Sequence, residues 1–428
     1  MEPTPTERPR QRAVLAALVP AGSSAAADPL AEIRGLAEAA GAEVVGGLVQ
    51  RLASPHPRTA FGKGKVEELR QLAEQTEADL VVVDFDLSPS QGRNLEKDLE
   101  RRVVDRTELI LDIFASRART RQARLQVQLA QMEYLRTRLQ RMWTHLERTE
   151  GAIGARGPGE TQLETDRRLV ARAIRDLKAR LREIEGRRRR EAASRSDRIT
   201  VSLVGYTNAG KSSLMRALTG EEVFVADQLF ATLDTLIRSW SLADGRTVLL
   251  TDTVGFVRDL PHHLVSSFHA TLEETLQADL LLHVVDASDP EAEAHGRAVD
   301  EVLDGLGARE IPRLVIYNKV DRLDGLERAA LAAGHPEAVL VSALRGEGLD
   351  ELHRAVARVL DDWSLHLEVQ VPAAAGRLLA EIRRGALVEE EAWQDSTWQG
   401  RIRILPRAWG ILGTQVEAAG GLYRPLLA

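Results

Sequence analysis

The sequence predicts an α/β protein built from four parts: an N-terminal parallel α/β subdomain, an antiparallel helical hairpin, a central doubly wound sheet that is mostly parallel, and a small C-terminal α+β domain. In two regions, short apolar runs alternate with helical stretches, the pattern of a parallel sheet with helices between its strands. Between these regions lies an arginine-rich segment with apolar residues at spacings of three and four, which is typical of long helices. We expect the four parts to cover residues 1–105, 106–197, 198–364 and 365–428.

The first α/β region extends from Ala13 to Asp105. Its apolar runs are AVLAALV, EVVGGLV, DLVVVDF and RVVD, and the helices predicted between them cover residues 29–40, 65–75 and 88–101. Within this region, FGKGKVEEL places Lys63 and Lys65 before a helix. The two lysines either contact a phosphate group or belong to a flexible helix start, and the sequence favours neither explanation.

The arginine-rich region contains two apolar seams joined by a glycine-rich stretch. The first seam comprises Leu125, Leu129, Met132, Leu135, Leu139, Met142 and Leu146. The second comprises Val170, Ile174, Leu177, Leu181 and Ile184. Because GAIGARGPGE separates the seams, we predict an antiparallel hairpin with its tip at residues 151–159 and Arg156 as the exposed cation of the tip. The arm that ends at Arg148 would project roughly 35 Å.

Charge is distributed unevenly along the chain. Residues 101–190 contain 23 Arg and Lys against 12 Asp and Glu, which gives this segment a net charge of +11. Because the whole chain has a net charge of −7, the residues outside the segment together carry −18. A basic segment in an acidic protein is expected where that segment meets a polyanion. A solvated helix surface is the alternative explanation.

The composition limits the class of protein. No apolar run approaches the ~20 residues needed to cross a bilayer, and the N-terminal MEPTPTERPRQR lacks the apolar core of a secretory signal. The chain has no cysteine, which excludes disulfides and thiolate zinc sites. We therefore expect a cytoplasmic protein without a membrane span.

The central region, from Ile199 to about Trp363, contains the strands ITVSLVG, TVLLTDT, LLLHVVDAS, RLVIYNK and AVLVSAL. These runs are apolar throughout, as strands buried on both faces should be. SWSLADGRTVLL adds a hairpin that turns at Asp244 and Gly245, so one antiparallel edge strand is expected. Beyond Leu365 we predict a small βαββ segment.

A phosphate-binding loop follows the first of these strands. GYTNAGKSS matches the pattern G-x-x-x-x-G-K-S between a strand and a helix, the context that the pattern requires. In such loops the amides and the helix N-terminus hold nucleotide phosphates, Lys211 reaches the β and γ phosphates, and Ser212 ligates Mg²⁺. The nucleotide-binding candidates of the loop are Gly205, Tyr206, Thr207, Asn208, Ala209, Gly210, Lys211, Ser212 and Ser213.

Two further stretches complete the phosphate and metal site. DTVG places Asp252 at a strand end, where it would hold Mg²⁺ through water, with Thr253 beside it and the Gly255 amide directed at the γ-phosphate. In FATLDT we assign Thr232 as the switch threonine that senses Mg²⁺ and the γ-phosphate. The catalytic candidates are therefore Lys211, Thr232 and Gly255, and the metal candidates are Ser212, Thr232 and Asp252.

The base-binding motif is NKVD. Asp321 can accept hydrogen bonds from the N1 and N2 donors of guanine, which adenine does not offer, while Asn318 and Lys319 brace the pocket. In VSAL, the Ser342 and Ala343 amides would meet guanine O6. These motifs, in this order, predict a P-loop GTPase domain that binds GTP and GDP with Mg²⁺.

Two residues of the motifs raise questions about hydrolysis. Phe256 follows DTVG where GTPases of the Ras type carry the glutamine that orients water, so we expect slow intrinsic hydrolysis that a partner stimulates. The downstream Glu273 and Glu274 are unproven substitutes. Asn208 either coordinates K⁺ near the phosphates or only shapes the loop, and both explanations stay open.

The chain resembles the HflX family of translational GTPases. The resemblance rests on GKGKVEEL, DRTELILDIFASRARTRQARLQVQLAQMEYLRTRL, GARGPGETQLETDRRLV, GYTNAGKSSL, LFATLDT, DTVGF and NKVD, and it covers nearly the whole chain. It implies binding to the large ribosomal subunit, hydrolysis stimulated by the ribosome, and splitting or rescue of stalled or stressed ribosomes. It also implies that the hairpin tip approaches the peptidyl transferase region. The candidate contacts to ribosomal RNA are Arg136, Arg138, Arg141, Arg156, Gly157 and Gly159.

Two other functions fit the same motifs. The hairpin could be a dimerisation arm through which GTP drives self-assembly. If the protein instead binds the ribosome, we expect it to be a monomer when it is free. Alternatively, the chain is a GTP-dependent RNA-modification or ribosome-assembly factor. That alternative would require an additional catalytic constellation, and we find none in the sequence.

Overall fold

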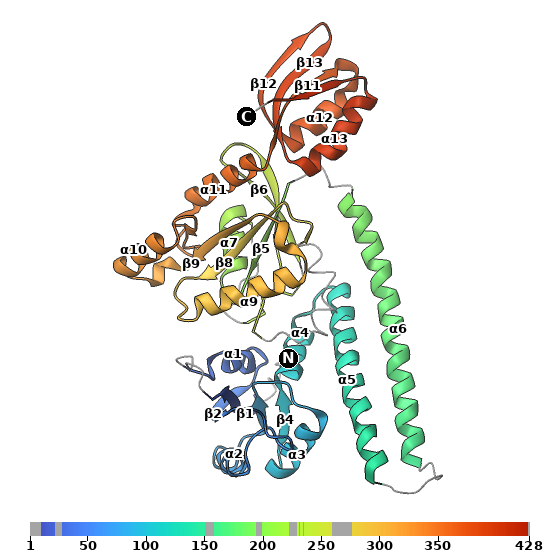
Figure 1. The fold of residues 1–428 in the computed structure, drawn as a ribbon, viewed down its shortest axis with the longest axis vertical. Coiled ribbons are helices and arrows are strands. Elements are labelled where there is room, and N and C mark those ends of the chain that lie inside the picture. The colour runs from blue at the N-terminus through green and yellow to red at the C-terminus, as the bar shows by residue number, and fades with distance from the viewer. Residues whose placement is uncertain are drawn as a thin grey trace, which may run out of the picture. The chain divides into compact units, whose positions relative to one another are not determined.

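The computed structural model describes residues 10–21, 28–149, 158–193, 199–221, 229–230, 232–233, 235–258 and 276–426, with side chains described for all of them except 140–149, 158–163 and 188–193. The chain divides into two compact units. The first comprises Met1–Glu183, Asp227–Leu233 and Asp259–His269, and the second comprises Ile184–Ala226, Asp234–Arg258 and Ala270–Ala428. Figure 1 shows the ribbon of both units, with labels on many of their helices and strands.

The first unit begins with a parallel sheet, which confirms the predicted N-terminal α/β fold. Its strands, in the spatial order β2-β1-β3-β4, are β1 (Arg12–Pro20), β2 (Glu43–Leu52), β3 (Leu80–Val83) and β4 (Arg102–Asp105). Its helices are α1 (Ala31–Ala39), α2 (Lys63–Gln75), α3 (Pro89–Leu99) and α4 (Arg106–Arg117). Apolar residues of α2 and α3, such as Leu69 and Leu95, share one core with Val14 and Val81 of the sheet.

The lysines of the GKGK stretch lie in the first turn of α2. The helix begins at Lys63 after the extended residue Gly62, and Lys65 forms an ion pair with Glu68 one turn later, at 2.7 Å. The stretch therefore forms the first turn of a helix, and phosphate contact through the two lysines stays a prediction.

Asp105 connects the sheet to the helices that follow it. Its carboxylate caps α4 by accepting the Glu108 N–H at 2.9 Å, and it also accepts the Tyr134 hydroxyl at 2.9 Å and the Arg138 guanidinium at 2.8 Å. Burial raises the pKa of Asp105 above its ordinary value, although these donors oppose the shift. Because Tyr134 and Arg138 both belong to the next helix, one buried carboxylate fixes that helix against the end of β4.

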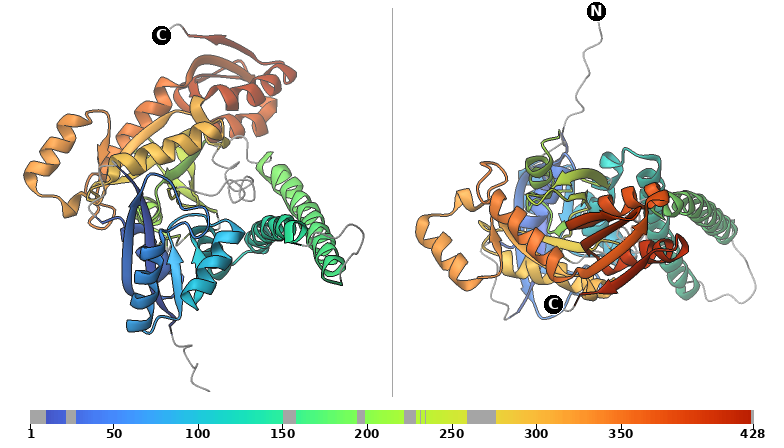
Figure 2. Two further views of the ribbon diagram at one scale, coloured as in Figure 1. Left: turned by 60° about the horizontal axis from the view of Figure 1, so that its bottom comes forward. Right: turned by 90° about the horizontal axis from the view of Figure 1, so that it is seen from above.

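Two long helices form the predicted hairpin: α5 (Arg121–Thr149) and α6 (Pro158–Ala193). They lie side by side in both views of Figure 2, and Lys178 of α6 pairs with the buried Glu133 of α5 at 2.7 Å. Val170, Ile174 and Leu181 are buried along α6, as the second seam predicts.

The first seam holds only in part. Leu125 and Leu129 are buried, but Leu135 is 40% exposed. The buried face of α5 instead includes Ala123 and Val127 near its start, where the helix packs against α3 and α4. The apolar spacing identified the helix correctly, but its N-terminal half packs on the α/β subdomain as well as on α6.

The second unit contains a six-stranded sheet, which confirms the predicted doubly wound fold. The strand order is β10-β9-β8-β5-β7-β6, and only β6 pairs in the antiparallel direction. The strands are β5 (Thr200–Gly205), β6 (Leu236–Ser241), β7 (Thr247–Asp252), β8 (Leu280–Asp286), β9 (Arg313–Asn318) and β10 (Val339–Leu340). The helices are α7 (Lys211–Thr219), α9 (Ala292–Gly305), α10 (Gly325–Gly334) and α11 (Leu349–Asp362), with 3₁₀ turns at Ala308–Glu310 and Val320–Arg322.

A four-stranded antiparallel sheet follows. It comprises β11 (Leu365–Pro372), β12 (Ala386–Gln394), β13 (Thr397–Ile404) and β14 (Leu422–Pro425), with a 3₁₀ turn at Ala373–Ala375 and the helices α12 (Gly376–Gly385) and α13 (Pro406–Ala418). The sequence predicted only βαββ. The structure adds α13 and β14, because Pro406 starts a helix whose Trp409, Leu412 and Val416 complete the core of this domain.

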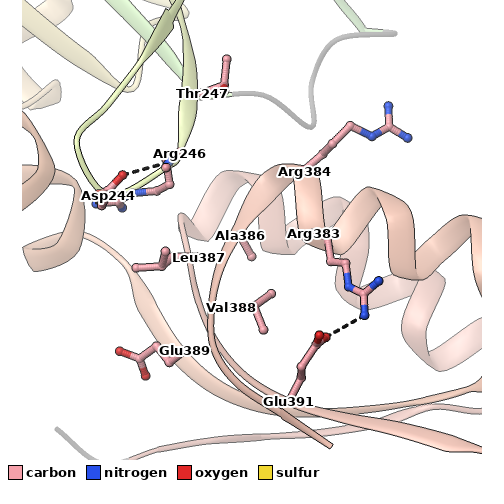
Figure 3. A pocket seen from close by; sticks show the side chains of 11 residues that line it. Asp244, Arg246, Thr247, Arg383, Arg384, Ala386, Leu387, Val388, Glu389 and Glu391 are labelled. Carbon is pink, nitrogen blue, oxygen red and sulfur yellow. Dashed lines mark hydrogen bonds and ion pairs between the residues drawn. The ribbon is translucent and has the colours of Figure 1, made fainter. Parts of the chain in front are cut away.

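A pocket of about 470 Å³ lies between the turn that joins β6 to β7 and the residues of α12 and β12 (Figure 3). Arg246 in that turn pairs with Asp244 at 2.5 Å and with Asp361 of α11 at 2.9 Å. Asp361 also binds Arg403 of β13 at 3.2 Å. The pocket includes none of the residues that the motifs predict for nucleotide binding.

No helix in the described part of the chain is both long enough and apolar enough to cross a bilayer.

Candidate GTPase active site

The phosphate loop lies between β5 and α7, as its motif requires. Gly205 (φ 148°) and Gly210 (φ 92°) have backbone angles that favour glycine. A Cβ atom at Gly205 would lie 2.2 Å from the Val284 carbonyl oxygen, and one at Gly210 would lie 2.2 Å from Asn318 Nδ2. Only glycine fits at either position, so the loop keeps its backbone close to the neighbouring strands.

Asn208, in the same loop, also has a positive φ of 60°. Asparagine is one of the few residues other than glycine that adopt this conformation readily. Loop shape is therefore one physical reason for asparagine at this position.

Lys211 is buried at the start of α7 and points back along the loop. Its Nζ donates hydrogen bonds to the carbonyl oxygens of Gly205, at 2.9 Å, and Tyr206, at 2.8 Å. Burial lowers the pKa of Lys211 to about 8, the charge of Asp252 opposes the shift, and that of Lys319 adds to it. The ammonium group is thus held against the loop backbone, and in this motif the lysine is the residue that meets the β and γ phosphates.

Ser212 and Asp252 bring two oxygen ligands together. The Ser212 hydroxyl donates to Asp252 Oδ2 at 2.6 Å, and Asp252 is fully buried at the end of β7. Next to it, the Thr253 hydroxyl binds the Leu203 carbonyl oxygen at 2.8 Å and so fixes the strand end. A hydroxyl and a carboxylate are hard donors of the kind that Mg²⁺ prefers. Ser213 lies in the first turn of α7, partly buried.

Gly255 lies directly against the phosphate loop. A Cβ atom at this position would be 2.8 Å from Thr207 Cα and 3.0 Å from Lys211 Nζ. The next residue, Phe256, is only 3% exposed, and its backbone pairs with the loop. The buried phenyl ring has no group that could orient a water molecule.

The base-binding motifs converge on Asn318, at the end of β9. Its amide donates to the Ala209 carbonyl oxygen at 2.9 Å, and its side-chain oxygen accepts the Ala343 N–H at 3.0 Å. Asn318 therefore joins the phosphate loop to the VSAL loop.

Asp321 and Lys319 are oriented by neighbouring residues. The Ser342 hydroxyl donates to Asp321 Oδ1 at 2.6 Å, and this bond lowers the pKa of Asp321, so the carboxylate is charged at neutral pH. Lys319, at a positive φ of 64°, pairs with Asp286 at 2.7 Å. No sequence motif pointed to Asp286, although its place at the end of an apolar strand was a usable signal.

Thr232 belongs to the first unit, together with the residues just before it. Phe230 is buried and packs edge to face against Phe114 of α4, with ring centroids 4.7 Å apart. Leu229 lies against Gly35 of α1. Leu229 and Phe230, the first two residues of the LFATLDT motif, therefore pack on the N-terminal subdomain, which the motif itself did not predict.

The candidate ribosome contacts are only partly described. Arg156 and Gly157 lie outside the described residues, as do Glu273 and Glu274, while Gly159 lies in the first turn of α6. Arg141 lies in α5, but its side chain is not described. Arg136 is exposed. Arg138 is half-buried, pairs with Asp105 and lies over the Tyr134 ring at 4.6 Å, so it fixes α5 within the fold.

The fold and the site together define a P-loop GTPase: a doubly wound sheet, a phosphate loop that opens α7, paired Ser212 and Asp252 oxygens, and an Asp321 carboxylate held by Ser342. Three family models match the chain. They are described as "GTP-binding GTPase N-terminal" (residues 27–115), "GTP-binding GTPase Middle Region" (117–195) and "50S ribosome-binding GTPase" (200–319).

Curated relatives match over most of the chain. GTPase HflX of Magnetococcus marinus is 47% identical over 91% of this chain and 91% of its own length. GTPase HflX of Escherichia coli strain K12 is 45% identical over 86% of this chain and 87% of its own. GTPase HflX of Caldanaerobacter subterraneus is 43% identical over 90% and 89%, respectively. The chain belongs to the HflX family of GTPases, and it binds guanine nucleotides and hydrolyses GTP.

Proposed function

We propose that this GTPase binds the large ribosomal subunit through its α5–α6 hairpin and splits or rescues stalled ribosomes. The observation that carries the proposal is a set of exposed arginines on the hairpin for which the described residues provide no acidic partner: Arg121, Arg136, Arg172, Arg175 and Arg180. Ribosomal RNA is a polyanion, and unpaired arginines gain most from phosphate contacts. The model that matches residues 200–319 is described as "50S ribosome-binding GTPase", which supports the same partner.

We further propose that Mg²⁺ is the metal cofactor, held by Ser212 and Asp252, with Thr232 joining them in the GTP state. Mg²⁺ held by these oxygens would neutralise the negative charge that develops on the nucleotide phosphates during hydrolysis. Lys211 would bind the same phosphates through its ammonium group, and the Gly255 amide would bind the γ-phosphate. Water then attacks the γ-phosphorus atom, and GDP leaves with inorganic phosphate as the second product.

Hydrolysis should depend on the ribosome because of Phe256. The residue that orients water in Ras-type GTPases is replaced here by a buried phenyl ring, which neither donates nor accepts a hydrogen bond. A group supplied or ordered by the large subunit would then position the water. Proposed K⁺ coordination beside Asn208 is a separate contribution, which a comparison of hydrolysis rates in KCl and NaCl would test.

The switch around Thr232 supplies a route from nucleotide to hairpin. The preceding Phe230 packs on Phe114 of α4, and α4 leads directly into α5. When GTP orders Thr232, the change would reach the subdomain that carries the hairpin. Hydrolysis would reverse it and release the protein from the ribosome.

The arginine proposal is tested by charge reversal on the hairpin. The variant Arg136→Glu, Arg172→Glu, Arg175→Glu should bind large subunits at least tenfold more weakly. The slope of the logarithm of its binding constant against the logarithm of the salt concentration should be smaller in magnitude by about two to three. The matched control reverses three exposed arginines of the second unit: Arg297, Arg358 and Arg377. Sedimentation binding at several salt concentrations measures both quantities. Equal weakening by the two triple variants would refute a specific role for the hairpin.

A further inference from the structure

Tyr206, the second residue of the phosphate loop, uses its side chain within the protein. Its ring stacks on the imidazole of His295 in α9, with centroids 3.8 Å apart and planes only 10° from parallel. His295 is itself held by a hydrogen bond between Nδ1 and the Asp289 carboxylate at 3.0 Å. The tyrosine hydroxyl accepts the backbone N–H of Arg258 at 2.7 Å.

Arg258 ends the stretch Val254–Arg258, here named the switch segment, which contains Gly255 and Phe256. Three described hydrogen bonds tie this segment to the phosphate loop. The Thr207 N–H donates to the Phe256 carbonyl at 2.7 Å, the Phe256 N–H donates to the Gly205 carbonyl at 3.2 Å, and the third is the bond from Arg258 to Tyr206. The first two join backbone to backbone. Only the third depends on the identity of a side chain.

The switch segment has little freedom to move toward the loop. A Cβ atom at Gly255 would already lie 2.8 Å from Thr207 and 3.0 Å from Lys211 Nζ, so the glycine is at contact distance from the lysine that meets the γ-phosphate. The amide of this glycine is the group that binds the γ-phosphate in GTPases. Its position therefore depends on how firmly the segment is attached on both sides of Phe256.

We infer that Tyr206, braced by His295, is a positioning residue for GTP hydrolysis: it fixes the switch segment so that the Gly255 amide meets the γ-phosphate. The tyrosine hydroxyl anchors the far end of the segment, and the His295 ring prevents the tyrosine from rotating away. The hydrogen bond between the Arg258 N–H and the Tyr206 hydroxyl is important in this GTPase because the buried Phe256 contributes only its backbone to the site. Tyr206 therefore affects binding of the γ-phosphate, which GDP lacks, and GDP is bound by the rest of the phosphate loop.

The substitution Tyr206→Phe tests this role because it retains the stacked ring and removes only the hydroxyl. We expect the affinity for a fluorescent, non-hydrolysable GTP analogue and the single-turnover rate of GTP hydrolysis each to fall about three- to tenfold, the effect of one lost hydrogen bond. The affinity for fluorescent GDP should stay within about twofold of the wild type. The measurements contain no ribosomes, so they do not depend on the ribosomal proposal.

A second pair of variants tests the brace. His295→Ala should reproduce the selective loss, and His295→Phe, which retains an aromatic face for stacking, should restore most of it. A purely structural role for Tyr206 would weaken GDP and the GTP analogue equally, and that result would overturn the inference. Unchanged GTP-analogue affinity and hydrolysis in Tyr206→Phe would overturn it as well.

Discussion

At the scale of single residues, we propose that the choice of nucleotide depends on one carboxylate. Asp321 is charged and held by Ser342, so it can accept two hydrogen bonds from guanine at once. Asp321→Asn replaces part of this acceptor by a donor. Because hydrogen bonds to a charged group contribute about 1.5–3 kcal/mol each, we expect GTP affinity to fall at least about a hundredfold.

The same substitution should improve binding of xanthosine triphosphate, whose base has a carbonyl oxygen where guanine has its 2-amino group. Competition of GTP and of xanthosine triphosphate against fluorescent GDP measures this change in nucleotide preference. If Asp321→Asn kept its preference for GTP, the assignment of Asp321 to the base would be wrong.

His283 makes stability depend on pH. It is buried in β8, its Nδ1 lies 3.7 Å from Asp300, and Arg313 and Lys211 are the nearby cations. Burial lowers the pKa of His283, the two cations lower it further, and Asp300 only partly opposes them. The unfolded chain, with an ordinary histidine pKa of about 6.5, therefore takes up a proton that the folded protein resists.

It follows that the free energy of unfolding decreases as pH falls below about 6.5, by at most about 1.4 kcal/mol per pH unit from this group. Thermal unfolding between pH 7 and pH 5 measures the effect. In His283→Gln, which does not titrate, the decline over this range should be smaller. An identical decline in both proteins would assign the pH dependence to other groups.

At the scale of elements, the contact between Phe230 and Phe114 connects the segment that precedes Thr232 to α4. We expect amide hydrogen exchange in Arg106–Arg117 to be slower with a GTP analogue than with GDP. The difference should disappear in Phe230→Ala. Phe85→Ala is a suitable control, because its ring packs against Phe61 in another part of the same subdomain. Nucleotide-dependent protection that persists in Phe230→Ala would show that the signal takes a different route.

The elements also show what could be predicted from the sequence. The phosphate loop and the β9 end were predictable, because a strand, a short loop and a helix place Lys211 and Asn318 by local geometry alone. The burial of Leu125 and Leu129 was predictable from helical periodicity, but the exposure of Leu135 was not. Periodicity identifies the apolar face of a helix and leaves open which partner covers each part of it.

Contacts between residues distant in sequence carried no local signal. The Asp105 carboxylate accepts hydrogen bonds from Tyr134 and Arg138 of α5, and the ring of Tyr206 stacks on His295 of α9. Each contact depends on how strands and helices are ordered in space. The sequence motifs specify residue types at fixed spacings, so they contain no information about such pairs.

At the scale of the whole molecule, the division of the chain matters for function. The phosphate loop, Asp252 and the residues proposed to bind guanine belong to one unit, while Thr232 and the hairpin as far as Glu183 belong to the other. If Thr232 senses the γ-phosphate and the hairpin binds RNA, as we propose, this grouping makes the affinity for RNA depend on the bound nucleotide. The proposed function therefore makes one claim about the whole molecule: its affinity for the ribosome depends on the bound nucleotide.

Sucrose-gradient sedimentation of intact ribosomes with the protein and a non-hydrolysable GTP analogue tests that claim most directly. We predict that the protein comigrates with large subunits and that the fraction of intact ribosomes decreases, with GDP giving neither effect. Deleting Gly154–Gly159 at the hairpin tip should retain GTP binding and abolish both effects. Comigration that is the same with GDP as with the GTP analogue, or intact ribosomes that persist under all conditions, would contradict the account.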